Sequence, residues 1–175
     1  MKNAPLKLVL FGNELLQQKA KAVRKVTECH RQKLDEMLKL MRELAGVGLA
    51  AQQVGLTEAL IVVAAGDSVY KLINPKIIKK QGSQSMEEGC LSVPGVGIKV
   101  CRAKKVWVKA LDEFGAPVEI VAENLVATAF QHELDHLAGK LIVDYASFLE
   151  RIRIKDTLEK IKKKTLKGTL RKDYV

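Results

Sequence analysis

The pentapeptide His132-Glu133-Leu134-Asp135-His136 constrains this chain more than any other feature. In an α-helix, residues four apart differ by only ~40° around the axis, so both histidines would lie on one face. Two imidazoles placed in this way can bind one metal ion, and Glu133 beside them can act as a general base towards water. Only three histidines occur in the chain, and two of them are in this motif. The sequence therefore predicts a helix that carries a metal site.

Helical signals extend upstream of the motif. Asn124 has a side-chain oxygen that can cap the start of a helix, and residues 125–137 carry apolar side chains at helical spacing. Leu125 and Ala129 are four residues apart and His132 follows three later, so these three residues would share one face. We therefore expect an apolar surface next to the metal site.

Other segments predict an α+β fold. Apolar residues recur every three or four positions over 29–45, which is typical of an amphipathic helix. Short β-branched runs at 59–63 and 69–73 predict strands, and runs at 105–110 and 118–122 around polar turn residues predict a hairpin. We expect a central metal-binding helix packed against antiparallel sheet, with N-terminal and C-terminal helices.

Length and composition favour one domain. No segment resembles a linker, so we expect a single domain over 1–175, within which 147–175 forms a basic C-terminal helix and tail. An odd number of cysteines, three, and the lack of a secretory signal indicate a reducing compartment, the cytoplasm. The apolar run at 8–11 is too short to span a membrane, so we expect no membrane association. The sequence also lacks the strand-to-helix arrangement of a phosphate-binding loop, so we expect no nucleotide cofactor.

The net charge is concentrated near the C-terminus. Residues 151–175 hold ten Lys or Arg against three Asp or Glu, which accounts for +7 of the net charge of +10. One interpretation is a solvated helix face, and the other is attraction to a polyanion such as RNA.

A catalytic metal needs a third protein ligand besides the two histidines. One large group of zinc proteases extends the motif to a third histidine, but Ile142 occupies that position here. A thermolysin-like protein would use a glutamate some twenty residues downstream, where the candidates are Glu150 and Glu159. Glu159 lies among lysines on a predicted surface helix, which makes it a poor ligand.

The cysteines offer an alternative ligand. For Cys29 and Cys101, roles as small buried apolar residues suffice. Cys90 differs, because Gly89 and Pro94 around it break regular structure and can bring the backbone close to a ligand. A thiolate from Cys90 would complete a Cys-His-His site with a position left open for water.

Three separated segments give the chain a clear resemblance to the peptide deformylase family. They are 46–53 (GVGLAAQQ), 88–92 (EGCLS) and 131–139 (QHELDHLAG). The resemblance implies an enzyme that removes the N-formyl group from the initiator methionine of newly made polypeptides and releases formate. It also implies one divalent metal ion, Fe²⁺ natively, with Zn²⁺, Ni²⁺ or Co²⁺ able to take its place.

The resemblance further implies a role for individual residues. The implied metal ligands are Cys90, His132 and His136. Glu133 would be the acid and base of the reaction, and Gln53 and Leu91 would stabilise the carbonyl oxygen. The peptide would lie extended against backbone at Gly48 and Gly89, and the methionine side chain would enter a pocket for which the candidates are Val47, Leu125 and Ala129.

Some residues depart from the family pattern or suggest support for the site. Gly12 stands where proline is common and Gln52 where proline is frequent, while Asn124 replaces a frequent glycine. Asparagine tolerates left-handed backbone, so Asn124 could keep that turn. Glu88 can pair with Arg102 to brace the Cys90 loop, although a solvated pair would give the same sequence.

Two other functions compete with the deformylase interpretation. A zinc endopeptidase could use the same pair of histidines, but it would need an acidic third ligand. A metal-stabilised RNA-binding module would leave Glu133 without a purpose and would usually need four protein ligands. The C-terminal basic segment could bring a deformylase to the ribosome, where formylated chains emerge.

Overall fold

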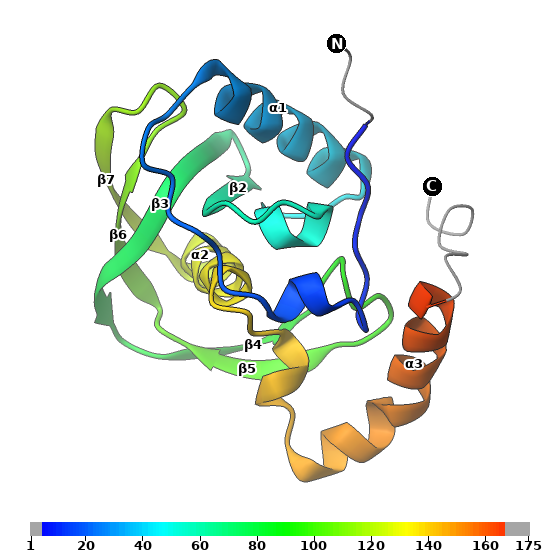
Figure 1. The fold of residues 1–175 in the computed structure, drawn as a ribbon. Coiled ribbons are helices and arrows are strands. Elements are labelled where there is room, and N and C mark those ends of the chain that lie inside the picture. The colour runs from blue at the N-terminus through cyan, green and yellow to red at the C-terminus, as the bar shows by residue number, and fades with distance from the viewer. Residues whose placement is uncertain (1–4, 167–175) are drawn as a thin grey trace.

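The computed structural model describes residues 5–166 and confirms the predicted α+β fold (Figure 1). A five-stranded antiparallel sheet has the strand order β1-β2-β3-β6-β7, and β4 and β5 form a separate antiparallel pair. The strands are β1 (Gly48–Ala50), β2 (Leu60–Ala65), β3 (Ser68–Gln81), β4 (Gln84–Glu88), β5 (Ile98–Arg102), β6 (Lys105–Leu111) and β7 (Pro117–Glu123). The helices are η1 (Glu14–Gln17), α1 (Glu28–Glu43), η2 (Ala51–Val54), α2 (Asn124–Leu137), η3 (Ile142–Tyr145) and α3 (Phe148–Leu166), of which the η elements are 3₁₀ turns.

Strand β2 is buried on both faces because it lies between two helices. Successive side chains of a strand point to opposite faces. Leu60 and Val62 pack into the same apolar cluster as Met37 of α1, whereas Ile61 packs with Phe130 of α2. This double burial explains why the sequence of β2 is a continuous apolar run, and it places α2 in the middle of the molecule (Figure 1).

Strand β3 is much longer than the predicted strand at 69–73. It continues to Gln81 through Pro75, which lacks a backbone N–H. The register with β6 shifts between Ile73 and Lys76, so the proline falls in a bulge, where no ladder hydrogen bond is lost. Asn74 before it has a positive φ of 53°.

The predicted capping of α2 by Asn124 is wrong. The N-cap residue is Glu123, and it makes no side-chain capping bond. Asn124 has φ 53°, and its backbone N–H donates to the carbonyl of Lys104 at 2.8 Å. The residue thus forms the left-handed turn that joins β7 to α2, which agrees with the expectation that asparagine could replace glycine there.

Helix α3 packs into the same apolar cluster as Leu10 of the N-terminal segment. Ile154 and Ile161 are buried, whereas Phe148, Leu149 and Ile152 are exposed. The helix lies against Gly12, where a Cβ atom would be only 2.8 Å from Cγ of Lys162. A proline at Gly12 would therefore meet α3.

The extent of the domain stays a prediction, since residues 167–175 of the predicted tail lie outside the described residues. Within residues 5–166, no helix has both the length and the apolar character needed to cross a membrane.

Candidate metal centre

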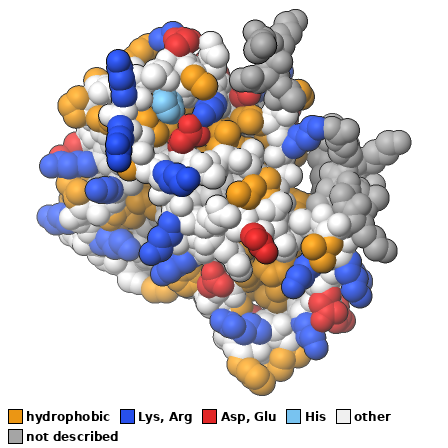
Figure 2. All heavy atoms as spheres, in the orientation of Figure 1, with side chains coloured by type: hydrophobic (Ala, Val, Ile, Leu, Met, Phe, Trp, Pro, Cys, Tyr) orange, Lys and Arg blue, Asp and Glu red, His pale blue; other side chains and the backbone are white. Residues whose placement is uncertain are grey.

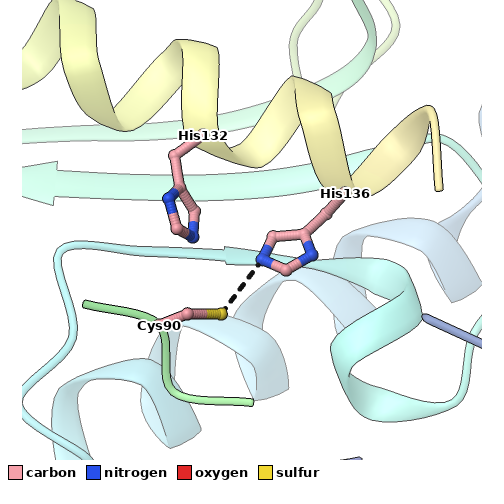
Figure 3. Close-up of side chains that lie close together, drawn as sticks. All are labelled: Cys90, His132 and His136. Atoms are coloured by element: carbon pink, nitrogen blue, oxygen red, sulfur yellow. Dashed lines mark hydrogen bonds between the residues drawn. The ribbon is translucent and has the colours of Figure 1, made fainter. Parts of the chain in front are cut away.

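Cys90, His132 and His136 meet at one point although they come from two distant segments (Figure 3). Their ligand atoms all lie within 4.8 Å of one another, and Sγ of Cys90 is 3.3 Å from Nε2 of His136. The histidines occupy successive turns of α2, with ring centroids 5.0 Å apart. Cys90 lies in the loop after β4, so this loop and α2 together bring one sulfur and two imidazoles into contact.

The geometry of these side chains and the neutral form of His136 fit a bound divalent metal. Around a tetrahedral zinc ion, a thiolate sulfur and an imidazole nitrogen are about 3.6 Å apart, given metal–ligand distances of ~2.3 and ~2.0–2.1 Å. The 3.3 Å between Cys90 and His136 is close to that value. Burial lowers the pKa of His136 well below its ordinary value, which keeps the ring in the neutral form that a metal requires.

A buried ion pair orients His132. Nδ1 of His132 lies 2.9 Å from Oε2 of Glu88, and Glu88 accepts two hydrogen bonds from Arg102, at 2.8 and 3.0 Å. Burial opposes a charge on His132, but hydrogen bonds with Cys90 and Glu88 outweigh it and raise the pKa of the ring. Glu88 and Arg102 are 6% and 7% exposed, so the pair is buried and not solvated.

Glu133 is a buried carboxylic acid beside these residues. Its side chain is 3% exposed, and within residues 5–166 its Oε2 has no hydrogen-bond partner. Burial raises the pKa of Glu133 to about 7; His132 and Arg102 oppose the rise, while the carboxylates of Glu88 and Asp135 add to it. A carboxyl group with a pKa near neutrality can both accept and return a proton.

Gly48 leaves the space that Glu133 occupies. A Cβ atom at Gly48 would lie 2.8 Å from the carboxyl carbon of Glu133 and closer still to one of its oxygens. At Gly89 a Cβ atom would meet no atom within 4 Å. The family resemblance implied that both glycines allow a peptide to approach. The structure adds that Gly48 lacks a side chain because the carboxyl group of Glu133 fills the space beside it.

Gln53 points its amide nitrogen into the site. Its Oε1 accepts a hydrogen bond from the backbone N–H of Ala50 at 2.8 Å, which fixes the orientation of the amide. Nε2 therefore faces Ser92 Oγ at 3.2 Å and Cys90 Sγ at 3.6 Å. This preset donor is suited to a developing negative charge on an oxygen.

A cavity of about 750 Å³ adjoins this site. Such a volume is within the range of small-ligand pockets, ~300–1,000 Å³. Of the residues suggested by the resemblance, the cavity is lined by Val47, Gly48, Gln53, Gly89, Cys90, Leu91, Leu125, Ala129, His132 and Glu133. Sequence reasoning missed apolar lining residues from the N-terminal segment, α1, β4 and the loop after Cys90, including Leu8, Leu10, Leu40, Met86 and Val96.

The prediction that Cys29 and Cys101 are buried is wrong, since both thiols are exposed. Cys29 lies in the first turn of α1. Cys101 lies on β5, where Val100 and Arg102 on either side of it are buried and its own side chain points outward. Among the three cysteines, only Cys90 is buried.

The fold and the buried site define a metal-dependent hydrolase. The family model described as Polypeptide deformylase matches residues 5–152. Peptide deformylase of Carboxydothermus hydrogenoformans is 45% identical over 148 residues, which cover 85% of this chain and 97% of that protein. Peptide deformylase 1 of Shewanella oneidensis is 44% identical over 167 residues, 94% of this chain and 99% of that protein.

Solved structures agree with these relatives. A peptide deformylase from Legionella pneumophila superposes with a TM-score of 0.85 at 40% identity, covering 94% of this chain and 98% of that one. A Synechococcus elongatus peptide deformylase in complex with actinonin superposes with a TM-score of 0.83 at 39% identity. The match covers 91% of this chain and 89% of that one. The chain belongs to the polypeptide deformylase family. It is an enzyme that removes the N-formyl group from nascent peptides in a metal-dependent reaction, which decides against the endopeptidase and RNA-binding alternatives.

Proposed function

We propose that Cys90, His132 and His136 bind one divalent metal ion at which Glu133 drives deformylation. The observation that carries this proposal is the convergence of their three ligand atoms within 4.8 Å, beside a buried carboxylate. We propose Fe²⁺ as the native ion. Zn²⁺, Ni²⁺ and Co²⁺ can occupy the same thiolate and imidazole ligands, because such a set accepts all four.

Each proposed step follows from the position of a side chain. A bound metal would polarise the formyl carbonyl and lower the pKa of water. Glu133 takes a proton from the attacking water and returns it to the leaving amine. Nε2 of Gln53 and the backbone N–H of Leu91 donate to the oxygen on which negative charge develops. The fixed orientation of Gln53 supports its role, since a preset donor needs no rearrangement during the reaction.

We place the substrate in the 750 Å³ cavity. The formylmethionyl peptide would run extended past the backbone of Gly48 and Gly89. Its methionine side chain would point towards Val47, Leu125 and Ala129. Ala129 is buried and Leu125 is 46% exposed. Leu125 would therefore cover the methionine near the cavity mouth, and Ala129 would contact it deeper inside.

A formate-release assay tests this function. Protein purified without oxygen should release formate from a formylmethionyl peptide and leave an unformylated control peptide intact. The metal content should be one ion per chain. Cleavage of an internal peptide bond without formate would instead identify an endopeptidase.

Alanine at Gly48 should affect kcat, whereas alanine at Gly89 should affect KM. The Gly48→Ala methyl group would displace the carboxylate of Glu133, and a misplaced catalytic group costs about 100-fold in kcat. Gly89→Ala meets no protein atom, so it should leave kcat unchanged and raise KM through contact with the peptide. Steady-state kinetics of both variants check this. An unchanged kcat in Gly48→Ala would contradict the assigned position of Glu133.

We also propose a cytoplasmic enzyme that contacts the ribosome through its basic C-terminal segment. Figure 2 shows Lys and Arg side chains on α3 and also over the sheet side of the molecule, so charge alone does not single out α3. Reversing three exposed charges of α3, with Lys155→Glu, Lys160→Glu and Lys163→Glu, should weaken ribosome binding and its salt dependence. The matched control reverses three exposed lysines of the sheet, Lys76, Lys80 and Lys109. Equal loss in both variants, measured by ribosome pelleting, would count against α3.

A further inference from the structure

Asp135 lies within the metal motif, yet it has no part in the reaction proposed above. Its carboxylate Oδ2 accepts a hydrogen bond from Nη1 of Arg102 at 2.5 Å and another from the hydroxyl of Tyr145 at 2.8 Å. Asp135 therefore joins two residues that are far apart in sequence. Both contacts lie away from the substrate cavity, which Asp135 does not line.

Tyr145 covers the guanidinium group of Arg102. It is the last residue of η3, three residues before α3 begins, and its ring centroid lies 4.8 Å from the Arg102 guanidinium carbon. Both residues line a second hollow of about 470 Å³, together with Asp135. Without the tyrosine ring, the guanidinium group would face the solvent in this hollow, and charge pairs weaken in water.

The contacts continue from Arg102 to a proposed metal ligand. Arg102 donates to both carboxylate oxygens of Glu88, and Oε2 of Glu88 is also the oxygen that faces His132 Nδ1. A guanidinium group with freedom to rotate would carry this carboxylate with it, because the two are held by a pair of bonds. The direction of the His132 ring thus depends on how firmly Arg102 is held.

We propose that Tyr145 and Asp135 are positioning residues that hold Arg102 and, through Glu88, keep Nε2 of His132 directed at the metal. The inference rests on the proposed ligands Cys90, His132 and His136. It links the retention of the metal to the segment that leads into α3. Loss of a partner that contacts a ligand directly lowers metal affinity by roughly 10–100-fold. Tyr145 is more distant, so we expect its removal to lower metal affinity by about tenfold, the lower end of that range.

The rate of metal release tests this role without relying on activity. Zinc-loaded protein is mixed with excess chelator, and release is followed at a temperature where circular dichroism shows every variant folded. Tyr145→Ala should release zinc about tenfold faster and Tyr145→Phe, which keeps the ring over Arg102, about threefold faster. The matched control is Phe148→Ala, an exposed aromatic residue three positions later, which should leave the rate unchanged.

A second background separates positioning from a general loss of stability. In Glu88→Gln the link to His132 is weakened, so adding Tyr145→Ala should change the release rate less than it does in the parent protein. A release rate for Tyr145→Ala equal to that of Phe148→Ala, or an effect of full size in Glu88→Gln, would overturn the inference while leaving the metal centre intact. A parent protein that retains no zinc would overturn the metal centre, and this inference with it.

Discussion

Replacing Cys90 with alanine should lower the affinity for a divalent metal by more than ~100-fold. This loss is larger than the loss that follows removal of a residue that only hydrogen-bonds to a metal ligand. Formate release should fall to background with it. The substitution removes one of three proposed ligands and the only sulfur among them, and two imidazoles alone hold a metal weakly. Competition against a chelator of known affinity measures the change.

The matched control for this variant is Cys101→Ala, which removes an exposed thiol. It should keep the metal affinity and the turnover of the parent protein. Because Cys90→Ala deletes one small buried side chain, the metal-free forms of both variants should unfold at similar temperatures. Parental metal stoichiometry and affinity in Cys90→Ala would show that the third ligand is another residue.

Glu133→Ala is expected to retain the metal and to lose turnover by ~10²–10⁴-fold, the usual contribution of a positioned acid or base. The variant removes the buried carboxyl group whose pKa is raised to about 7 and leaves all three proposed ligands in place. Metal analysis and single-turnover formate release on the same sample measure both quantities.

Glu133→Gln distinguishes proton transfer from shape. Glutamine fills the same space against Gly48, where the carboxylate packs, but it cannot take a proton from water. We therefore expect Glu133→Gln to be as inactive as the alanine variant. Turnover at the parental rate in either variant would remove Glu133 from the mechanism.

The parts of this molecule that sequence predicts well depend on local patterns. Helix α2 is predicted because apolar residues recur at helical spacing over residues 125–137. The motif indicates the two histidines. Cys90 is favoured as the third ligand because Gly89 and Pro94 break regular structure around it and because the peptide deformylase resemblance implies it, and this assignment stays a prediction. The prediction of the helix and its pair of histidines needed only the chemistry of the side chains and the period of a helix.

Long-range contacts explain what the sequence did not predict. The continuation of β3 past Pro75 depends on a bulge opposite β6, and the buried face of α3 depends on the N-terminal segment at Gly12. The orientation of Gln53 is set by a backbone group in a tight turn. The contact between Tyr145 and Asp135 spans ten residues and has no periodic signature. None of these is encoded by spacing alone.

X-ray absorption of the zinc-loaded protein tests most directly whether Cys90, His132 and His136 share one metal ion. We expect one sulfur at about 2.3 Å and two imidazole nitrogens at ~2.0–2.1 Å from each zinc. The sulfur contribution should be absent from the spectrum of Cys90→Ala. A parent spectrum with no sulfur, or a sulfur signal that survives in Cys90→Ala, would contradict the proposed centre.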